Sequence, residues 1–111
     1  MILYFKEIDD GNMNKDFLYN LDRARQLAGI PFVVTSAYRT VENELSNGRD
    51  GTSSHTKGLA VDIRVRSSRE RFTILNALIQ VGFNRIGIGK NFIHVDQDSD
   101  KVSNVIWTYY D

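Results

Sequence analysis

The chain of 111 residues contains no cysteine. It therefore has no disulfide, and any metal site must be built from histidine and carboxylate ligands instead of thiolates. It also has no surplus of charge, because fourteen basic residues balance fourteen acidic ones. That balance argues against nucleic acid and anionic membranes as partners. No apolar run approaches the roughly 20 residues that a membrane-spanning helix requires.

A chain of this length is expected to form one domain, residues 1–111, with a single hydrophobic core. We expect it to be a monomer. At the N-terminus an apolar stretch precedes Lys6 and the acidic Glu7, Asp9 and Asp10. A secretory signal has the opposite order, with basic residues ahead of a longer apolar stretch. We therefore expect no signal peptide and synthesis in the cytoplasm, so that action outside the cell would require release by another route.

Two helices carry apolar residues at helical spacing. The first is expected to begin after the cap Asn14 and to end at Gly29. Its apolar stripe is Phe17, Leu21, Ala24 and Ala28. The second begins at a capping box formed by Ser67 and Glu70. Its inward-facing residues are predicted to be Phe72, Leu75, Leu78 and Ile79. A shorter helix is predicted over residues 41–45.

Five segments are predicted to form strands, because they are short, rich in β-branched and aromatic residues, and bounded by turn residues. They are residues 32–34, 59–64, 85–89, 92–96 and 105–109. Trp107, in the last of them, is interpreted as a packing residue and not as a binding platform. Because the helices and strands do not alternate regularly, the fold class is predicted to be α+β, with helices packed on a small, mostly antiparallel sheet.

One histidine, His55, lies in a polar stretch that leads into the second of these strands. Asp62 follows seven residues later, on the polar face of the strand. A fully extended chain would separate the two by roughly 23 Å, so a shared metal requires a bend. Gly58 supplies the permissive backbone for that bend. Taken alone, the pattern also fits a polar loop with a solvated histidine.

The second histidine, His94, lies in another alternating segment. Ile93 and Val95 are expected on one face, and Phe92, His94 and Asp96 on the other. His55, Asp62 and His94 would supply three metal ligands and leave one tetrahedral position open. That arrangement is typical of catalytic zinc sites and not of structural ones.

These motifs resemble those of a known family. The pattern S-x-H-x-x-G-x-A-x-D at residues 53–62, followed by I-H-V-D at residues 93–96, resembles the zinc D-Ala-D-Ala peptidases, which cut the stem peptides of bacterial peptidoglycan. The likeness extends to the segment S-A-Y-R-T at residues 36–40 and is to the short members found in bacteriophages and bacterial genomes. It implies one Zn²⁺ and the fold shared with the hedgehog signalling domain.

The resemblance also implies roles for individual residues. Arg39, which could otherwise be a solvated turn residue, matches an arginine that faces the substrate, although Ala37 stands where glycine is common. Ser53 matches the family serine and is expected to hydrogen-bond near the metal ligands. Many members place an acidic base three residues before the last histidine, where this chain has Asn91. Asp96 is the predicted substitute, and the alternative is that it only orients His94.

Two functions follow from this reading. The first is a peptidoglycan peptidase, either a carboxypeptidase or an endopeptidase, acting as a phage lysin or a bacterial remodelling enzyme. D-Ala-D-Ala, L-Ala-D-Glu and cross-bridge bonds are all open as the bond cut. The second is a non-catalytic, zinc-bearing binding domain of the same fold, as in hedgehog proteins.

Overall fold

A single sheet of five strands organises the computed structural model, which describes residues 2–110. The strands, in chain order, are β1 (Val34–Ser36), β2 (Ala60–Arg64), β3 (Arg85–Ile88), β4 (Phe92–Asp96) and β5 (Val105–Thr108). Their order in the sheet is β1-β2-β4-β3-β5. The pairs β1–β2, β2–β4 and β3–β4 are antiparallel, and β3–β5 is parallel. The predicted α+β class with a mostly antiparallel sheet is confirmed.

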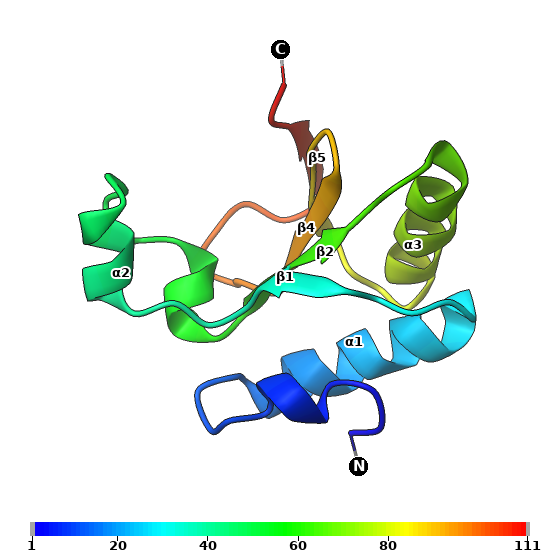
Figure 1. Ribbon diagram of the computed structural model, residues 1–111, viewed down its shortest axis with the longest axis horizontal. Coiled ribbons are helices and arrows are strands. Elements are labelled where there is room, and N and C mark those ends of the chain that lie inside the picture. The colour runs from blue at the N-terminus through cyan, green and yellow to red at the C-terminus, as the bar shows by residue number, and fades with distance from the viewer. Residues whose placement is uncertain (1, 111) are drawn as a thin grey trace.

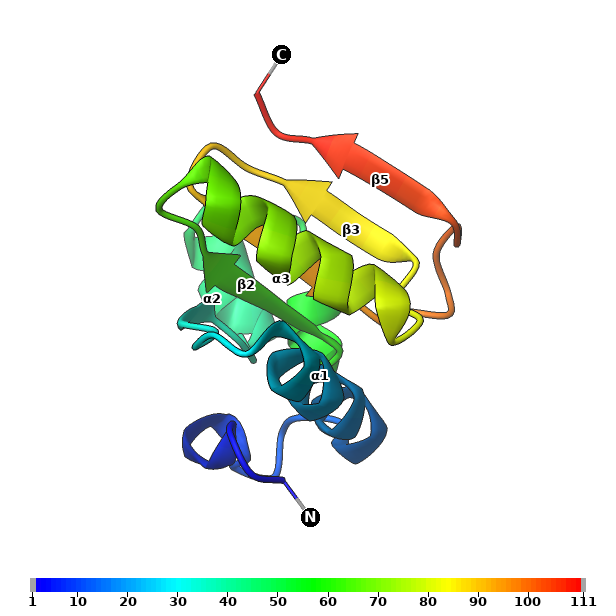
Figure 2. The same ribbon diagram turned by 90° about the vertical axis from the view of Figure 1, so that its right-hand side faces the viewer.

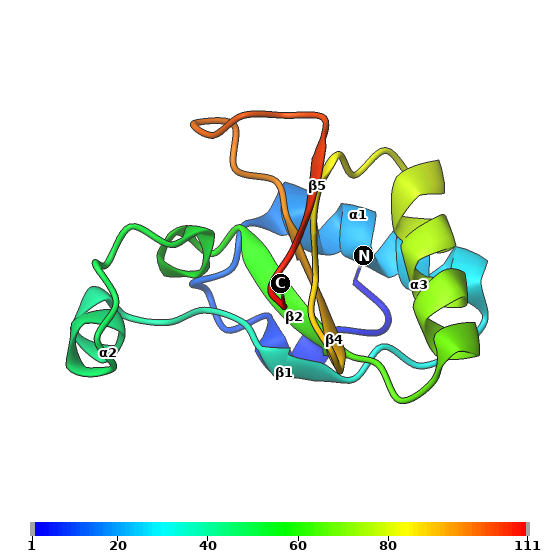
Figure 3. The same ribbon diagram turned by 90° about the horizontal axis from the view of Figure 1, so that it is seen from above.

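Helices lie on both sides of this sheet. The two longer helices, α1 (Lys15–Ala28) and α3 (Ser68–Gln80), pack against each other and cover one face (Figure 2). The short α2 (Val41–Ser46) lies on the other side, away from α1 and α3 (Figures 1 and 3). Two 3-10 turns complete the elements, η1 (Lys6–Ile8) and η2 (Ser54–Lys57). Within residues 2–110, no helix is both long enough and apolar enough to cross a membrane.

The predicted helix boundaries are confirmed at both ends of α1. The side chain of Asn14 accepts a hydrogen bond from the backbone N–H of Phe17, and Gly29 adopts a left-handed conformation directly after the helix. Ser67 caps α3 by accepting from the backbone N–H of Glu70. The capping box is incomplete, because the Glu70 carboxylate accepts from the backbone N–H of Arg66 instead of Ser67. Strand β1 begins two residues later than predicted.

The predicted inner face of α3 is wrong in part. Phe72 and Ile79 are largely exposed, whereas Ile74 and Ala77 are buried with Leu78. Phe72 and Ile79 are seven residues apart and therefore share one flank of the helix. The helix has apolar residues on more than one side, so packing against α1 and the sheet decides which of them becomes the inner face.

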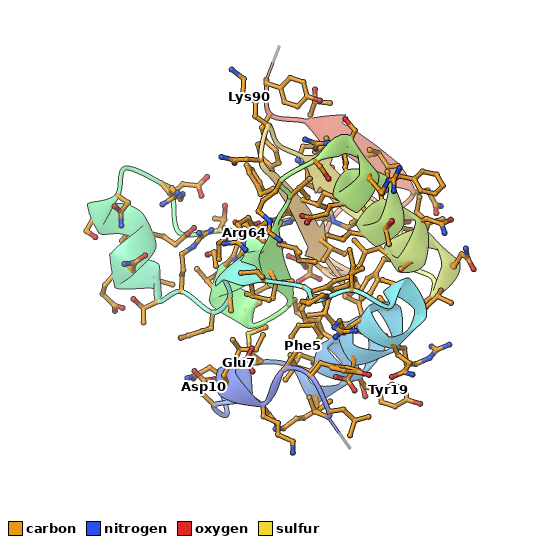
Figure 4. All side chains as sticks on the ribbon, turned by 45° about the vertical axis from the view of Figure 1, so that its right-hand side comes forward. Phe5, Glu7, Asp10, Tyr19, Arg64 and Lys90 are labelled. Atoms are coloured by element: carbon orange, nitrogen blue, oxygen red, sulfur yellow. The ribbon has the colours of Figure 1, made fainter. Side chains whose placement is uncertain are left out.

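The core lies between the two long helices and the sheet. The strands contribute Val61, Ile63, Ile86, Ile88, Ile93 and Val95, and α1 contributes Phe17, Leu18 and Leu21. Phe5, next to η1, closes the core from the N-terminal side, whereas Tyr19 points outward from α1 (Figure 4). Because strand side chains alternate between faces, burying Val61, Ile63, Ile93 and Val95 places Asp62 and His94 on the opposite face of the sheet.

Gly58 ends the loop that carries His55 (residues 53–58, the histidine loop) and connects it by a hydrogen bond to the start of α1. Its φ is +70°, and its carbonyl oxygen accepts from the backbone N–H of Asn14 at 2.9 Å. A Cβ added here would lie 2.0 Å from the carbonyl oxygen of Asn12. Only glycine therefore fits this position, for reasons of both backbone conformation and space.

We expect Gly58→Ala to lower the free energy of unfolding by about 2–5 kcal/mol, because left-handed strain and a backbone clash add together. Gly29→Ala is the matched control: its φ is +71°, but nothing lies within 4 Å of the added Cβ. It should cost only the strain, about 1–2 kcal/mol. Urea denaturation of both variants measures the difference, and equal losses would show that the contact with Asn12 is not a constraint.

Candidate metal centre

The three predicted ligands come together from three segments of the chain. Asp62 and His94 are direct partners in the β2–β4 register, and η2 brings His55 beside them. The Asp62 Oδ1 atom lies 3.0 Å from His94 Nδ1 and 3.4 Å from His55 Nε2. One ligand atom from each residue lies within 4.8 Å of the other two. This is the only such cluster among the described residues that could hold a metal ion.

The surroundings of His55 determine which of its nitrogens faces the cluster. Ser53 caps η2 by accepting the backbone N–H of His55 at 3.0 Å, which is the local role the structure shows for this serine. His55 Nδ1 lies 2.8 Å from the carbonyl oxygen of Ala37. A carbonyl can only accept, so Nδ1 carries a proton, and Nε2 is the nitrogen that faces Asp62. In the neutral form of His55, Nε2 would offer a lone pair to a metal ion that Asp62 also binds.

His94 lies between two carboxylates. Its Nδ1 faces Asp62, and its Nε2 lies 2.7 Å from Asp96 Oδ2. Burial alone would lower the pKa of His94, but hydrogen bonds with Asp62 and Asp96 outweigh it and raise the pKa. For Asp62, burial alone would raise the pKa, but hydrogen bonds with the two histidines hold the pKa well below its ordinary value. A neutral imidazole has only one N–H, so a cation at Nδ1 leaves the single proton for Asp96. The donor set fits a bound metal.

Asp96 lies behind His94 as seen from the cluster. It is 1% exposed, and both its oxygens are occupied. Oδ2 faces His94, while Oδ1 accepts from Arg85 Nε at 2.7 Å and from the backbone N–H of Asp98 at 3.1 Å. Burial opposes the charge, but His94 and Arg85 hold the pKa of Asp96 below its ordinary value. This geometry favours the alternative reading of Asp96, in which it orients His94 and is not the base.

Arg39 lines the same cleft, and two residues outside the cleft lining hold its guanidinium group in place. Its Nη1 donates to Ser36 Oγ at 2.9 Å. Its Nε lies 2.7 Å from Glu44 Oε2, an ion pair too bent to count as a regular hydrogen bond. Glu44 is fully buried, whereas Val41 and Leu45 on the same short helix are exposed. Sequence reasoning missed Glu44, because a single acidic residue in a short helix carries no signal of burial.

A second missed residue, Asp98, holds the histidine loop. It is 1% exposed and accepts from Ser54 Oγ at 2.7 Å and from Lys57 Nζ at 3.0 Å. These bonds tie η2 to the segment after β4, and so support the position of His55. Asn91, by contrast, lies in the turn between β3 and β4 and lines a different groove. It is not among the residues that line the cleft over the cluster.

The cleft over the cluster has a volume of about 490 Å³. Besides the candidate ligands and Asp96, its walls include the cations Arg39, Arg49, Arg85 and Lys101 and the aromatic residues Phe92, Trp107 and Tyr109. Two imidazoles and a carboxylate that converge at the floor of an open cleft can hold a metal and leave space for a ligand beside it. This combination of fold and site is compatible with a metal-dependent enzyme.

Comparison with known proteins identifies the family. The family model described as Peptidase M15 matches residues 3–96, which include α1, the histidine loop and strands β1 to β4. The chain belongs to this family of zinc metallopeptidases that act on peptidoglycan. The match ends at Asp96 and does not include β5. No curated protein matches the chain.

We expect the purified protein to bind about one zinc ion per chain, and His55→Ala or His94→Ala to lose it, because three protein ligands typically hold a catalytic zinc. Asp62→Ala should weaken binding as well. Chelation should lower the melting temperature, since a metal bound only by the folded state stabilises it. Metal analysis and calorimetry provide the measurements. Asp16→Ala, which removes an exposed carboxylate on α1, is the control. Full zinc occupancy in the double histidine variant would contradict this assignment.

Asp96→Asn separates the two roles of that residue. If Asp96 orients His94, the variant should bind zinc about 10–100-fold more weakly and recover activity when zinc is saturating. A base would instead contribute about 10²–10⁴-fold to the rate, and its loss would leave zinc bound. The geometry predicts the first result. Arg85→Gln, which removes the other side-chain partner of Asp96, measures how much of the effect comes from that ion pair alone.

Proposed function

We propose that the protein is a zinc peptidase that hydrolyses an amide bond in the stem peptides or cross-links of bacterial peptidoglycan. His55, Asp62 and His94 would hold the Zn²⁺. The observation that supports this most directly is the convergence of one ligand atom from each of these three residues, all within 4.8 Å of one another, at an open cleft. We include carboxypeptidase and endopeptidase action, and a role in phage lysis, within this proposal.

Zinc at this position would supply a Lewis acid that polarises a carbonyl group and makes water more acidic. The protein's own side chains position the reactants. Ala37 and Asp96 each hold one imidazole through the nitrogen that faces away from the cluster. Arg39 has Nε and Nη1 engaged by Glu44 and Ser36, so its remaining donors are free for a carbonyl or carboxylate oxygen of the substrate.

A proton acceptor for the reaction would have to be a carboxylate that lines the cleft. Asp62 and Asp96 are the only carboxylates among the described residues that line the cleft. Asp62 faces both histidines, and Asp96 is paired with His94 and Arg85. This absence of an uncommitted carboxylate is the observation that favours the second candidate, a zinc-bearing domain that binds peptidoglycan without cutting it.

A digest of purified peptidoglycan distinguishes the two candidates. We expect the zinc-loaded protein to release fragments whose masses identify the bond cut, and chelation to stop their release. The same sample should be tested for co-sedimentation with intact peptidoglycan. Binding without any new fragment would support the binding domain, and neither binding nor cleavage would contradict both candidates.

Arg39→Lys should reduce kcat/KM by about 10²-fold while zinc content and fold remain unchanged. Lysine keeps the charge but loses the planar pair of donors that can grip one oxygen from a fixed direction. Kinetics on a soluble stem peptide provide the measurement. Arg69→Lys, at an exposed position on α3, is the matched control. An Arg39→Lys enzyme as fast as the native one would show that Arg39 does not contribute to catalysis through its contact with the substrate.

A further inference from the structure

Strand β5 lies outside the region that the family model matches, yet it forms one wall of the cleft. It pairs in parallel with β3 at the edge of the sheet opposite to β1. Trp107 on β5 and Tyr109 directly after it both line the cleft. Ile106, between Val105 and Trp107, points away and is 57% exposed. The segment that follows the family match therefore contributes directly to the site.

Register places Trp107 in line with the candidate ligands. Asp62 pairs with His94, His94 with Gly87, and Gly87 with Trp107, so that one row crosses four strands. Gly87 has no side chain, and the two rings lie over it. A Cβ there would be 2.6 Å from Trp107 Nε1 and 2.6 Å from Tyr109 Cε2. Because Gly87 has no side chain, the rings of Trp107 and Tyr109 can lie over strand β3.

The rings form a continuous surface beside the cluster. The Trp107 ring centroid is 5.6 Å from that of His94, and the Tyr109 centroid is 6.5 Å from it. Phe92 extends the surface, at 5.2 Å from Tyr109. The guanidinium of Arg85 lies 5.0 Å from the Trp107 ring and steadies it by a cation–π contact. Trp107 is half-buried and Tyr109 is 52% exposed, so both present ring surface to the cleft.

The two edges of the sheet offer different chemistry to a bound molecule. Ser36, which holds Arg39, pairs with Asp62 on the β1 side, so the arginine and the aromatic surface flank the cluster from opposite sides. A ligand that spans the cluster would contact the guanidinium group of Arg39 at one end and the rings of Trp107 and Tyr109 at the other. That combination suits a peptide with a carbonyl or carboxylate group on one side of the scissile bond and aliphatic groups on the other.

We propose that Trp107 and Tyr109 are substrate-binding residues that hold the stem peptide on the side of the scissile bond opposite to Arg39. This proposal rests on the proposed peptidase function, and it differs from the sequence-based interpretation of Trp107 as a packing residue. The contact is made equally in the bound and reacting states, so it lowers KM and leaves kcat unchanged. Removing one ring from such a contact changes affinity by about tenfold.

The chain contains a single tryptophan, so its intrinsic fluorescence reports on Trp107 alone. We expect titration of the zinc-loaded protein with a synthetic stem pentapeptide to change this emission saturably. Trp107→Leu and Tyr109→Leu should each raise KM for the same peptide about tenfold, with kcat and zinc content unchanged. Trp107→Phe should recover most of the affinity, because it keeps an aromatic ring. Ile106→Ala, on the same strand but facing away, is the matched control and should behave as the native protein.

The outcomes separate this proposal from the one on which it depends. A native protein that neither binds nor cuts the peptide would contradict the proposed function itself. A native protein that cuts the peptide, with Trp107→Leu and Tyr109→Leu at native KM, would overturn only the aromatic binding surface. A loss of kcat or zinc in these variants at native KM would also overturn it. If Trp107→Leu does not fold, Tyr109→Leu and Trp107→Phe still decide the question.

Discussion

The register between β2 and β4 is the constraint on which the site depends. It sets Asp62 against His94, and the same row continues to Ser36 on β1 and through Gly87 to Trp107 on β5. A slip of one residue would turn every side chain of a strand to the other face. The buried Val61, Ile63, Ile93 and Val95 prevent such a slip, because it would expose them to water. The hydrophobic core therefore holds the polar site in place.

Buried carboxylates provide a second layer of support behind the cleft. Glu44, Asp96 and Asp98 are almost completely buried, and each is paired with a cation: Arg39, Arg85 and Lys57, respectively. A buried charge without its partner is strongly destabilising, typically by about 3–5 kcal/mol. Each of these pairs supports a residue of the cleft, namely Arg39 itself, His94 and, through Ser54, the loop of His55. The energetic cost of separating the pairs thus limits movement of residues around the cleft.

Features that depend on local rules could be predicted from the sequence alone. Caps at Asn14 and Ser67, the left-handed Gly29, and strand alternation around Asp62 and His94 depend on neighbours within a few residues, so their outcome could be predicted. That His55, Asp62 and His94 lie close together could also be predicted. Histidine is rare in this chain, cysteine is absent, and the spacing of the motifs restricts which side chains can meet.

Features that depend on contacts between distant segments could not be predicted from the sequence and become visible in the folded chain. Asp96 shares a strand face with His94, but the positions of Arg85 and Asp98 determine that both its oxygens are occupied. The exposure of Phe72 depends on how α3 packs against α1, and the burial of Glu44 depends on Arg39. Trp107 reaches the cleft because β5 pairs with β3 beside a glycine. In each case the deciding neighbour lies on another segment, and alternation or helical spacing within one segment carries no information about it.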